Sequence, residues 1–163
     1  MSIHTGKLRN MSSVYLLRND EILLLYRQGT SIVSNLWIGS AGGHFESSEL
    51  NDAKACVLRE MKEELGLDPE DISNLQLRYV TLRYTEGEIR QNYYFFANLT
   101  AELSIVPQST EGHCQWFPLS QITNLRMPFT AGYVINHYLT EGQYTNYLYG
   151  AIADKTSMHF HQL

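Results

Sequence analysis

Short apolar runs separated by polar turns dominate the first 45 residues. Residues 13–18 and 21–27 are aliphatic or β-branched runs split by Asn19-Asp20, and this arrangement predicts a β-hairpin. Residues 28–36 are polar and typical of a turn. Residues 37–45 are rich in glycine, which lets a backbone adopt positive φ or approach a ligand closely. We therefore expect two strands that lead into a glycine-rich loop.

A helical period of apolar residues marks the segment 51–65. Strong helix formers fill it, and one face repeats at helical spacing through Ala53, Val57, Met61 and Leu65. Asn51 or Asp52 is expected to cap the N-terminus. Gly66, with Pro69 shortly after it, is expected to end the helix.

The remaining chain alternates strand-like runs with one further helical segment. Residues 75–84 and 89–99 flank the turn-like sequence 85–88, which predicts a second, longer hairpin. The other predicted elements are a strand at 115–117 ended by Pro118, a helix at 131–139, and closing strands at 144–153 and 158–161. Strands with two helices and mostly hairpin connections favour an α+β fold or a mixed-sheet sandwich.

Length and charge narrow the class of protein. A chain of 163 residues with 44% hydrophobic and 18% charged residues favours one globular domain, spanning residues 1–163, over a disordered chain. The net charge of -5 and the lack of a basic stripe argue against nucleic acid as a partner. We expect the charge of a phosphorylated small molecule to be handled locally, by a metal ion or a few basic groups.

The cysteines favour a reducing compartment, and the apolar runs argue against a membrane partner. Cys56 and Cys114 are expected to be reduced core thiols, and no spacing resembles a zinc site. Residues 1–10 are not followed by the apolar run of a signal peptide, and the apolar run 22–26 is too short to span a membrane. The expected location is the cytoplasm. The oligomeric state, monomer or homodimer, stays open.

Three carboxylates share one face of the predicted helix. Glu60, Glu63 and Glu64 lie at i, i+3 and i+4, where like charges repel by a few tenths of a kcal/mol per exposed pair. A divalent cation reverses that sign, and hard oxygen ligands favour magnesium or manganese. Arg59, four residues before Glu63, can hold it by a charged hydrogen bond. Three glutamates alone would also be explained by a solvated helix face.

The surrounding residues favour the metal site. Gly42-Gly43 precedes the helix, Glu46 follows the glycines, and residues 59–67 read Arg-Glu-Met-Lys-Glu-Glu-Leu-Gly-Leu. This segment resembles the Nudix box, whose core is Arg-Glu-aliphatic-x-Glu-Glu-x-Gly-aliphatic, at every defined position. A chance match in a chain of this length is on the order of 1 in 10⁴.

The chain departs from the box in one spacing. The step of 16 from Gly43 to Arg59 is about two residues longer than the usual pattern. The expected box glutamate could be Glu49, with a longer stretch to Arg59, and Asn51 stands at the usual distance. We expect the insertion to enlarge the loop 46–50 and to leave the helix intact, with the role of Glu49 open.

The resemblance implies a fold and a chemistry. Nudix proteins fold as a mixed sheet sandwiched between helices and act on a nucleoside diphosphate linked to another group. In them, magnesium stabilises phosphate charge and lowers the pKa of an attacking water. Carried over by position, Glu60 and Glu64 would be metal ligands, Glu63 a further ligand or the base that polarises water, the Gly43 carbonyl a completing ligand, and Arg59 structural support.

A carboxylate from outside the box is also expected. Many family members supply one from a loop, and Glu111, five residues before Trp116, is the best candidate here. A turn residue beside a glycine explains Glu111 equally well. Glu86 and Glu88 are weaker candidates, because a hairpin turn already explains them.

Aromatic residues resemble the MutT-like branch of the family, which hydrolyses oxidised purine nucleoside triphosphates. The resemblance rests on residues 37–39, on residues 116–119 and on the tyrosine-rich end. Residues that could stack on a base are Trp37, Tyr93, Tyr94 and Phe129, although residues of this kind more often belong to the core. The acidic pair that reads the base in this branch is replaced by Phe129-Thr130. Arg27 and His44 are candidate phosphate contacts, and a surface arginine is the alternative for Arg27.

Three functions follow. The first is magnesium-dependent hydrolysis of a nucleoside triphosphate, oxidised or not, such as 8-oxo-dGTP. The second is the same chemistry on a nucleotide sugar, ADP-ribose or a dinucleoside polyphosphate. The third is a nucleotide-sensing domain without catalysis, which the retained glutamates disfavour because such domains usually lose them.

Overall fold

The computed structural model describes residues 5–28, 35–100 and 107–163. Most of the turn expected over residues 28–36 lies outside them. The first predicted hairpin is confirmed, with β1 (Leu8–Arg18) and β2 (Glu21–Arg27) antiparallel and Arg18 opposite Glu21. Strand β1 begins five residues before the predicted segment, because its first part pairs with a distant strand rather than with β2.

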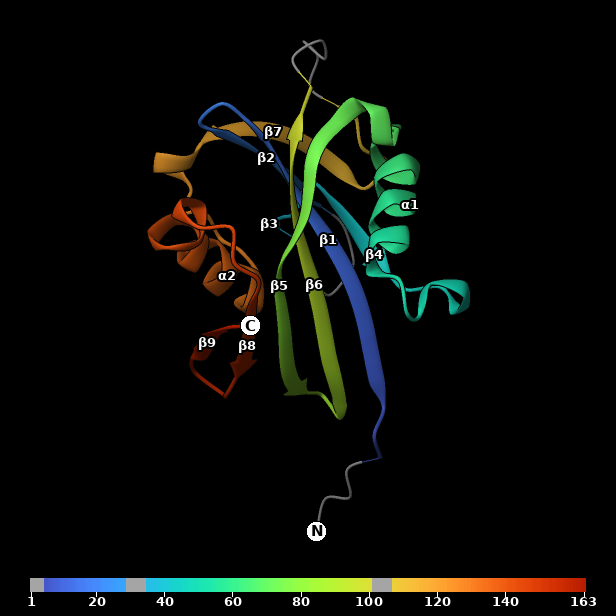
Figure 1. Ribbon diagram of the computed structural model, residues 1–163, viewed down its shortest axis with the longest axis vertical. Helices are drawn as coiled ribbons and strands as arrows, with labels where there is room; N and C mark the ends of the chain where they lie inside the picture. The colour runs from blue at the N-terminus through green and yellow to red at the C-terminus, as the bar shows by residue number, and fades with distance from the viewer. Residues whose placement is uncertain (1–4, 29–34, 101–106) are drawn as a thin grey trace.

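A nine-stranded mixed sheet organises the molecule (Figure 1). Its main path runs β3-β2-β1-β6-β5-β8-β9, with β4 paired to β1 and β7 paired to β2. The pairs β1–β6 and β5–β8 are parallel, and the other pairs are antiparallel. The other strands are β3 (Leu36–Ile38), β4 (Ala41–His44), β5 (Ile72–Thr85), β6 (Glu88–Leu99), β7 (Gly112–Pro118), β8 (Tyr149–Ala153) and β9 (Met158–Gln162).

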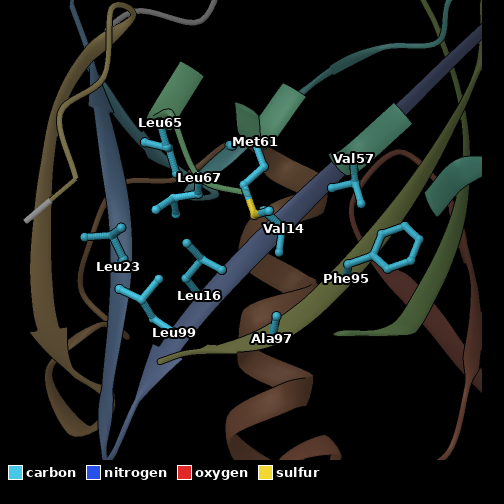
Figure 2. Packing of buried hydrophobic residues seen from close by; sticks show 11 residues of the cluster. Val14, Leu16, Leu23, Val57, Met61, Leu65, Leu67, Phe95, Ala97 and Leu99 are labelled. Atoms are coloured by element: carbon cyan, nitrogen blue, oxygen red, sulfur yellow. The ribbon is translucent and has the colours of Figure 1, made fainter. Parts of the chain in front are cut away.

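Two helices lie on opposite sides of the central strands (Figure 1). They are α1 (Ala53–Leu65) and α2 (Phe129–Thr140). One buried cluster, which includes Val14 and Leu16 of β1, packs under α1 (Figure 2). A second cluster, which includes Tyr15, packs under α2. Alternate residues of β1 therefore fill two cores, and the predicted α+β arrangement of a mixed sheet between helices is confirmed.

The predicted caps of α1 are confirmed. Of the two candidates for the N-cap it is Asp52 that acts, its Oδ1 accepting a hydrogen bond from the Ala55 amide at 3.0 Å. Gly66 ends the helix at φ 69°, in the left-handed region where glycine carries no Cβ penalty. The apolar stripe through Val57, Met61 and Leu65 is buried. The carboxylates on the same helix are thereby held above a fixed core.

The predicted strand over residues 144–153 is wrong in its first half, because β8 begins only at Tyr149. The buried guanidinium of Arg78 donates hydrogen bonds to carbonyls in this segment and just before it. Its Nε donates to Tyr147 O at 3.0 Å, and its Nη2 donates to Gly142 O at 2.7 Å and Thr145 O at 2.8 Å. Carbonyls that are already bonded to a side chain do not form a strand ladder.

The two cysteines expected in the core lie there as thiols. Cys56 is buried and Cys114 partly buried, and both are free thiols. Within the described ranges, no helix is long and apolar enough to cross a membrane. The predicted second hairpin is present as β5 and β6, and the strand expected at 115–117 is the middle of β7.

Candidate active site

A bidentate ion pair joins the loop before α1 to the helix. Arg59 Nε donates to Glu49 Oε1 at 2.6 Å, and Arg59 Nη2 donates to Glu49 Oε2 at 3.0 Å. Glu49 is 5% exposed. The hydrogen bonds from Arg59 lower the pKa of Glu49 to about 2, against the opposing effect of burial. The sequence left the role of Glu49 open, and the structure makes it the partner that fixes Arg59.

The two additional residues between Glu49 and Arg59 are absorbed before the helix begins. Residues 47–49 form a short 3-10 turn, in which the Glu46 amide donates to Glu49 Oε2 at 2.9 Å. The Asp52 amide then donates to the Glu49 carbonyl at 2.8 Å, directly before the first turn of α1. The loop thus leads directly into α1, and Arg59 on that helix reaches back to Glu49.

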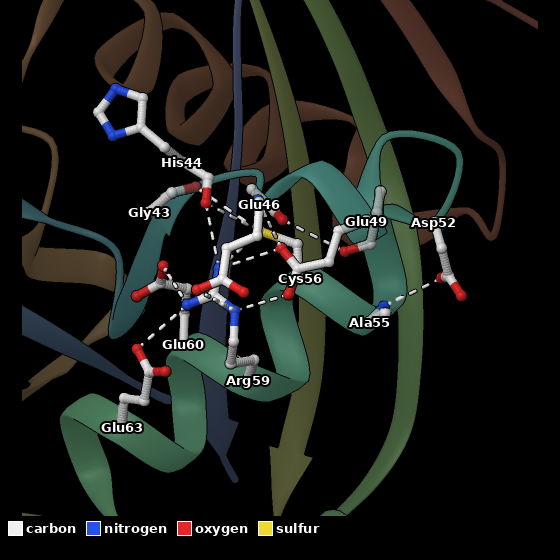
Figure 3. Close-up of polar contacts among 12 residues, drawn as sticks. Gly43, His44, Glu46, Glu49, Asp52, Ala55, Cys56, Arg59, Glu60 and Glu63 are labelled. Atoms are coloured by element: carbon white, nitrogen blue, oxygen red, sulfur yellow. Dashed lines mark hydrogen bonds and ion pairs between the residues drawn. The ribbon is translucent and has the colours of Figure 1, made fainter.

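The same guanidinium contacts two carboxylates of the helix (Figure 3). Arg59 Nη1 lies 2.9 Å from Glu60 Oε1 and 3.1 Å from Glu63 Oε2, and Nη2 donates to the His44 carbonyl at 3.1 Å. The hydrogen bond from Arg59 to Glu63 is the one expected from their i, i+4 spacing. The contact with Glu60 was not expected. One arginine thus forms ion pairs with four carboxylates, those of Glu46, Glu49, Glu60 and Glu63, and binds the β4 backbone.

Glycines bring the carboxylates of α1 against β4. The Gly42 amide donates to Glu64 Oε2 at 3.2 Å. A Cβ on Gly43 would overlap the carboxylate of Glu60, so any larger residue there would displace this carboxylate from its place against β4. Gly43 lies opposite Ser12 of β1, which places this contact over the central sheet. The glycine pair gives the acidic face close access to backbone.

Burial and mutual repulsion shift the ionisation of this face. Burial raises the pKa of Glu64 to about 7, and the charges of Glu60 and Glu111 add to the rise. Burial also raises the pKa of Glu60, although the hydrogen bond from Arg59 opposes it. Carboxylates in this state resist full ionisation unless positive charge is added.

Outside α1, Glu111 and Arg27 lie beside the same face. Arg27 Nη2 is 3.3 Å from Glu111 Oε2, where the end of β2 pairs with the start of β7. Both charges act on the pKa of Glu64, Glu111 raising it and Arg27 lowering it. The structure therefore brings together the box carboxylates, the carboxylate from outside the box and one of the two candidate phosphate contacts.

His44 lies at the border of the site, at the end of β4. Its ring Nε2 accepts a hydrogen bond from Arg9 Nε at 2.8 Å. An open cavity of about 450 Å³ adjoins it, lined by residues that include Lys7, Phe45 and Glu88. Burial and the charge of Arg9 lower the pKa of His44.

Of the four aromatic candidates, Tyr93 packs against the cluster under α1, and the other three lie on the α2 side of the sheet. Trp37 packs in the α2-side core with its ring centroid 4.7 Å from that of Phe117. Tyr94 is 5% exposed and stacks on Tyr15 in the same core. Phe129 begins α2, and the guanidinium of Arg83 lies 4.1 Å from the centre of its ring. The core alternative therefore describes Tyr94, and the ring of Phe129 already carries a cation.

The two weaker acidic candidates, Glu86 and Glu88, form ion pairs with arginine. Glu86 Oε2 lies 2.6 Å from Arg90 Nη2, and Glu88 Oε1 lies 3.0 Å from Arg90 Nε. Sequence reasoning did not identify Arg9, Arg83 or Arg90. The positions of Arg83 and Arg90, placed symmetrically about the turn 86–87, were a signal that these two residues face each other.

Within the described part of the chain, no three His, Cys, Asp or Glu side chains converge closely enough to hold a metal ion as they stand. The carboxylates keep their own partners, with Glu60 and Glu63 on Arg59 and Glu64 on the Gly42 amide. Their oxygens, with the backbone of β4, nevertheless supply the hard donor type that suits a divalent cation.

Comparison with known proteins places the chain in a family. The NUDIX domain family model matches residues 7–138, so the chain belongs to the NUDIX domain family. A search of curated protein sequences gives no match. Family and fold together make the chain a Nudix hydrolase. Nudix hydrolases act on nucleoside diphosphate-linked substrates and generally use divalent metal ions.

Solved structures show the same fold at low identity. A MutT protein from Bacillus halodurans has a TM-score of 0.70 at 20% identity, covering 93% of this chain and 97% of that one. A NUDIX hydrolase from Nitrosomonas europaea has a TM-score of 0.70 at 16% identity, covering 94% and 83%. An Ap4A hydrolase from C. elegans has a TM-score of 0.64 at 18% identity, covering 84% and 99%.

Proposed function

We propose that the protein hydrolyses a pyrophosphate bond in a nucleoside diphosphate-linked substrate with magnesium or manganese as cofactor. Nucleoside triphosphates, oxidised or not, such as 8-oxo-dGTP, are the first class to test. The observation that carries the proposal is the set of α1 carboxylates in which Glu64 and Glu60 lie against Gly42 and Gly43 of β4, and Glu60 and Glu63 share the guanidinium of Arg59.

The residues have distinct proposed roles. Glu60 and Glu64 would hold the cation with the Gly43 carbonyl, and Glu111 would complete the set from β7. Glu63 is 56% exposed, which suits a further ligand or a base that accepts a proton from water. When bound, the cation would stabilise phosphate charge and lower the pKa of the attacking water.

Basic and aromatic residues would hold the substrate. Arg27 would contact phosphate, since it lies within reach of Glu111 beside the acidic face. His44 would contact phosphate on the other side, through a ring whose pKa burial lowers. Trp37 and Phe129 stay proposed base contacts. Arg59, fixed by Glu49, is a positioning residue, since its five N–H groups are spent on carboxylates and one carbonyl.

The proposed unit is one domain over residues 1–163. Support comes from the parallel pairing of β8 with β5 and from Tyr149 of β8 in the α2-side core. The end of the chain beyond the matched residues 7–138 thus packs into the same sheet.

A substrate screen tests the proposal. Nucleoside triphosphates, 8-oxo-dGTP, ADP-ribose, a nucleotide sugar and a dinucleoside polyphosphate are each incubated with magnesium, with and without chelator. We expect release of phosphate, pyrophosphate or a nucleoside monophosphate that needs the metal. Tight binding in calorimetry without turnover of any compound would instead support a nucleotide-sensing domain.

A further inference from the structure

Three arginines stand side by side across three strands. Arg9 of β1 lies opposite Arg90 of β6, and Arg90 lies opposite Arg83 of β5. We call Arg9, Arg90 and Arg83 the arginine row. Like charges directly opposite each other destabilise a sheet, so the row needs negative charge from other groups.

The row faces the α2 side of the sheet. Alternate residues of a strand share a face, and the row follows the buried tyrosines of the α2-side core in this alternation. Arg83 lies four positions after Tyr79, and Arg90 lies four positions before Tyr94. The carboxylates of α1 lie on the other side, where that helix covers its own core. The sheet therefore separates any ligand of the row from the proposed cation site.

Carboxylates at the β5–β6 turn compensate the row only in part. Glu88 Oε1 lies 3.0 Å from Arg90 Nε and 3.5 Å from Arg9 Nη1, and its Oε2 lies 3.8 Å from Lys7 Nζ. Glu86 Oε2 lies 2.6 Å from Arg90 Nη2. With the third arginine of the row, this cluster holds four cations and two carboxylates. The excess of two positive charges suits a phosphate monoester, which carries about two negative charges near neutral pH.

Arg83 is the member of the row whose hydrogen-bond donors are available. Its guanidinium lies 4.1 Å from the centre of the Phe129 ring, and within the described part of the chain its side chain forms no hydrogen bond or ion pair. A guanidinium can contact an aromatic ring and also bind phosphate through two parallel hydrogen bonds. The ring thus holds the side chain in place while its N–H groups can receive an anion.

Polar groups lie beside the row on the same face. Thr81 precedes Arg83 by two residues, Asn92 follows Arg90 by two, and these two polar residues lie directly opposite each other. Thr81 is fully buried, and its Oγ1 has no hydrogen-bond partner among the described residues. An unpaired buried hydroxyl costs free energy, which an oxygen of a ligand or of a held water molecule would recover. This part of the face therefore offers a hydrogen-bond donor as well as positive charge.

We propose that the arginine row forms a second binding site, which takes the phosphate of a small molecule through Arg83 and Arg90 without a divalent cation. Directly opposite residues of neighbouring strands are about 5 Å apart, so both guanidinium groups can reach one phosphate. The ligand is a dianionic phosphate, either inorganic phosphate or a phosphate monoester. This site goes beyond the proposed function, because it lies on the other side of the sheet and needs no metal.

Calorimetry in chelator tests the inference. Inorganic phosphate, AMP and adenosine are each titrated into the full chain. We expect a phosphate compound to bind and adenosine not to bind. AMP that binds at least about tenfold more tightly than inorganic phosphate identifies a site for phosphate monoesters, and comparable or weaker binding of AMP identifies a site for phosphate itself. Binding of neither compound, or equal binding of AMP and adenosine, overturns the inference.

Variants of the row locate the phosphate. Arg83→Gln is expected to weaken its binding at least about tenfold, the size of one hydrogen bond to a charged group. Arg83→Lys is expected to keep part of the affinity, because the charge remains and the paired donors are lost. Lys54→Gln removes an exposed cation from α1 and is the control for net charge. Equal affinities of Arg83→Gln and Lys54→Gln would show that the phosphate does not bind at the row.

Arg27→Gln separates the two sites. Arg27 is the proposed phosphate contact beside the acidic face, so this variant should keep the metal-free affinity for phosphate within about twofold. Loss of binding in Arg27→Gln but not in Arg83→Gln would place the phosphate at the acidic face and overturn the inference. If the row binds phosphate and no compound of the substrate screen is hydrolysed, the second site stands and the proposed function fails.

Urea denaturation in chelator gives an independent readout. A ligand that binds only the folded state stabilises it in proportion to its occupancy. The phosphate compound that binds should therefore raise the urea midpoint of wild type more than that of Arg83→Gln. An equal rise in both proteins would contradict binding at the row.

Discussion

Two regions on opposite sides of β1 each gather like charges. On the α1 side, Glu60, Glu63 and Glu64 lie around one arginine that a buried carboxylate, Glu49, holds in place. On the α2 side, the arginine row lies around two carboxylates at a hairpin turn. The negative charge on the α1 side suits a cation, and the positive charge on the α2 side suits an anion.

The two regions also differ in how firmly they are built. Arg59 and Glu49 are tied to each other, to a turn and to the β4 backbone. Arg83 touches an aromatic ring and no carboxylate of the described chain. We infer that the acidic region needs Arg59 for folding as well as for function. Arg83, in contrast, acts on the ligand and not on the stability of the fold.

The largest effect is expected from the box glutamates. Glu64→Gln and Glu60→Gln should each lower kcat/KM about a thousandfold, since several kcal/mol of transition-state stabilisation is lost with the cation. Glu70→Gln, at an exposed turn beyond α1, is the matched control and should change the rate by less than about twofold. Rates measured at saturating magnesium check this, and an active Glu64→Gln would remove that residue from the site.

A stability effect should distinguish the two arginines. Arg59→Gln leaves Glu49 buried without its partner and should lower the free energy of unfolding by about 3 kcal/mol. Arg83→Gln should lower it by less than about 0.5 kcal/mol. Urea denaturation in chelator measures both. The double variant Arg59→Gln/Glu49→Gln should recover part of the loss, and a double variant as unstable as the single one would contradict a buried pair.

The smallest effect concerns pH. The pKa of Glu64, raised to about 7 by burial, lies above the ordinary carboxyl value of about 4.3, so the folded metal-free protein holds this proton more tightly. This contribution to stability is complete below the ordinary pKa and is lost as pH rises through about 7. Glu64→Gln should lack that loss.

The difference between wild type and Glu64→Gln isolates the effect, because His44 and His137, whose pKa values burial lowers, titrate in both proteins. Denaturation in chelator at several pH values from 5 to 8 is the measurement. Parallel curves for the two proteins would mean that Glu64 ionises normally.

The acidic region could be predicted from the sequence because a single helix carries its glutamates. Spacings of i, i+3 and i+4 are fixed by helical geometry, so Glu60, Glu63 and Glu64 could be assigned to one face without knowing the fold. The caps Asp52 and Gly66 were readable for the same local reason. The pairing of Glu49 with Arg59 was not, because the step from Glu49 to Arg59 is about two residues longer than the usual pattern.

The pairing of Arg83 with Arg90 could be predicted from the turn between them, whereas the place of Arg9 beside Arg90 could not. Arg9 and Arg90 are 81 positions apart, and only the parallel pairing of β1 with β6 makes them neighbours. The late start of β8 was hidden for a similar reason, since the carbonyls before it are bound by Arg78 from another strand. Local patterns thus predicted the elements and one face of the site, and long-range contacts decided the rest.

Manganese binding followed by electron paramagnetic resonance tests the central claim, that the acidic face of α1 holds a divalent cation. We expect wild type to deplete free Mn²⁺ at pH 7.5, Glu60→Gln to bind at least about tenfold more weakly, and Arg83→Gln to match wild type. Equal free Mn²⁺ with wild type and Glu60→Gln would contradict the claim.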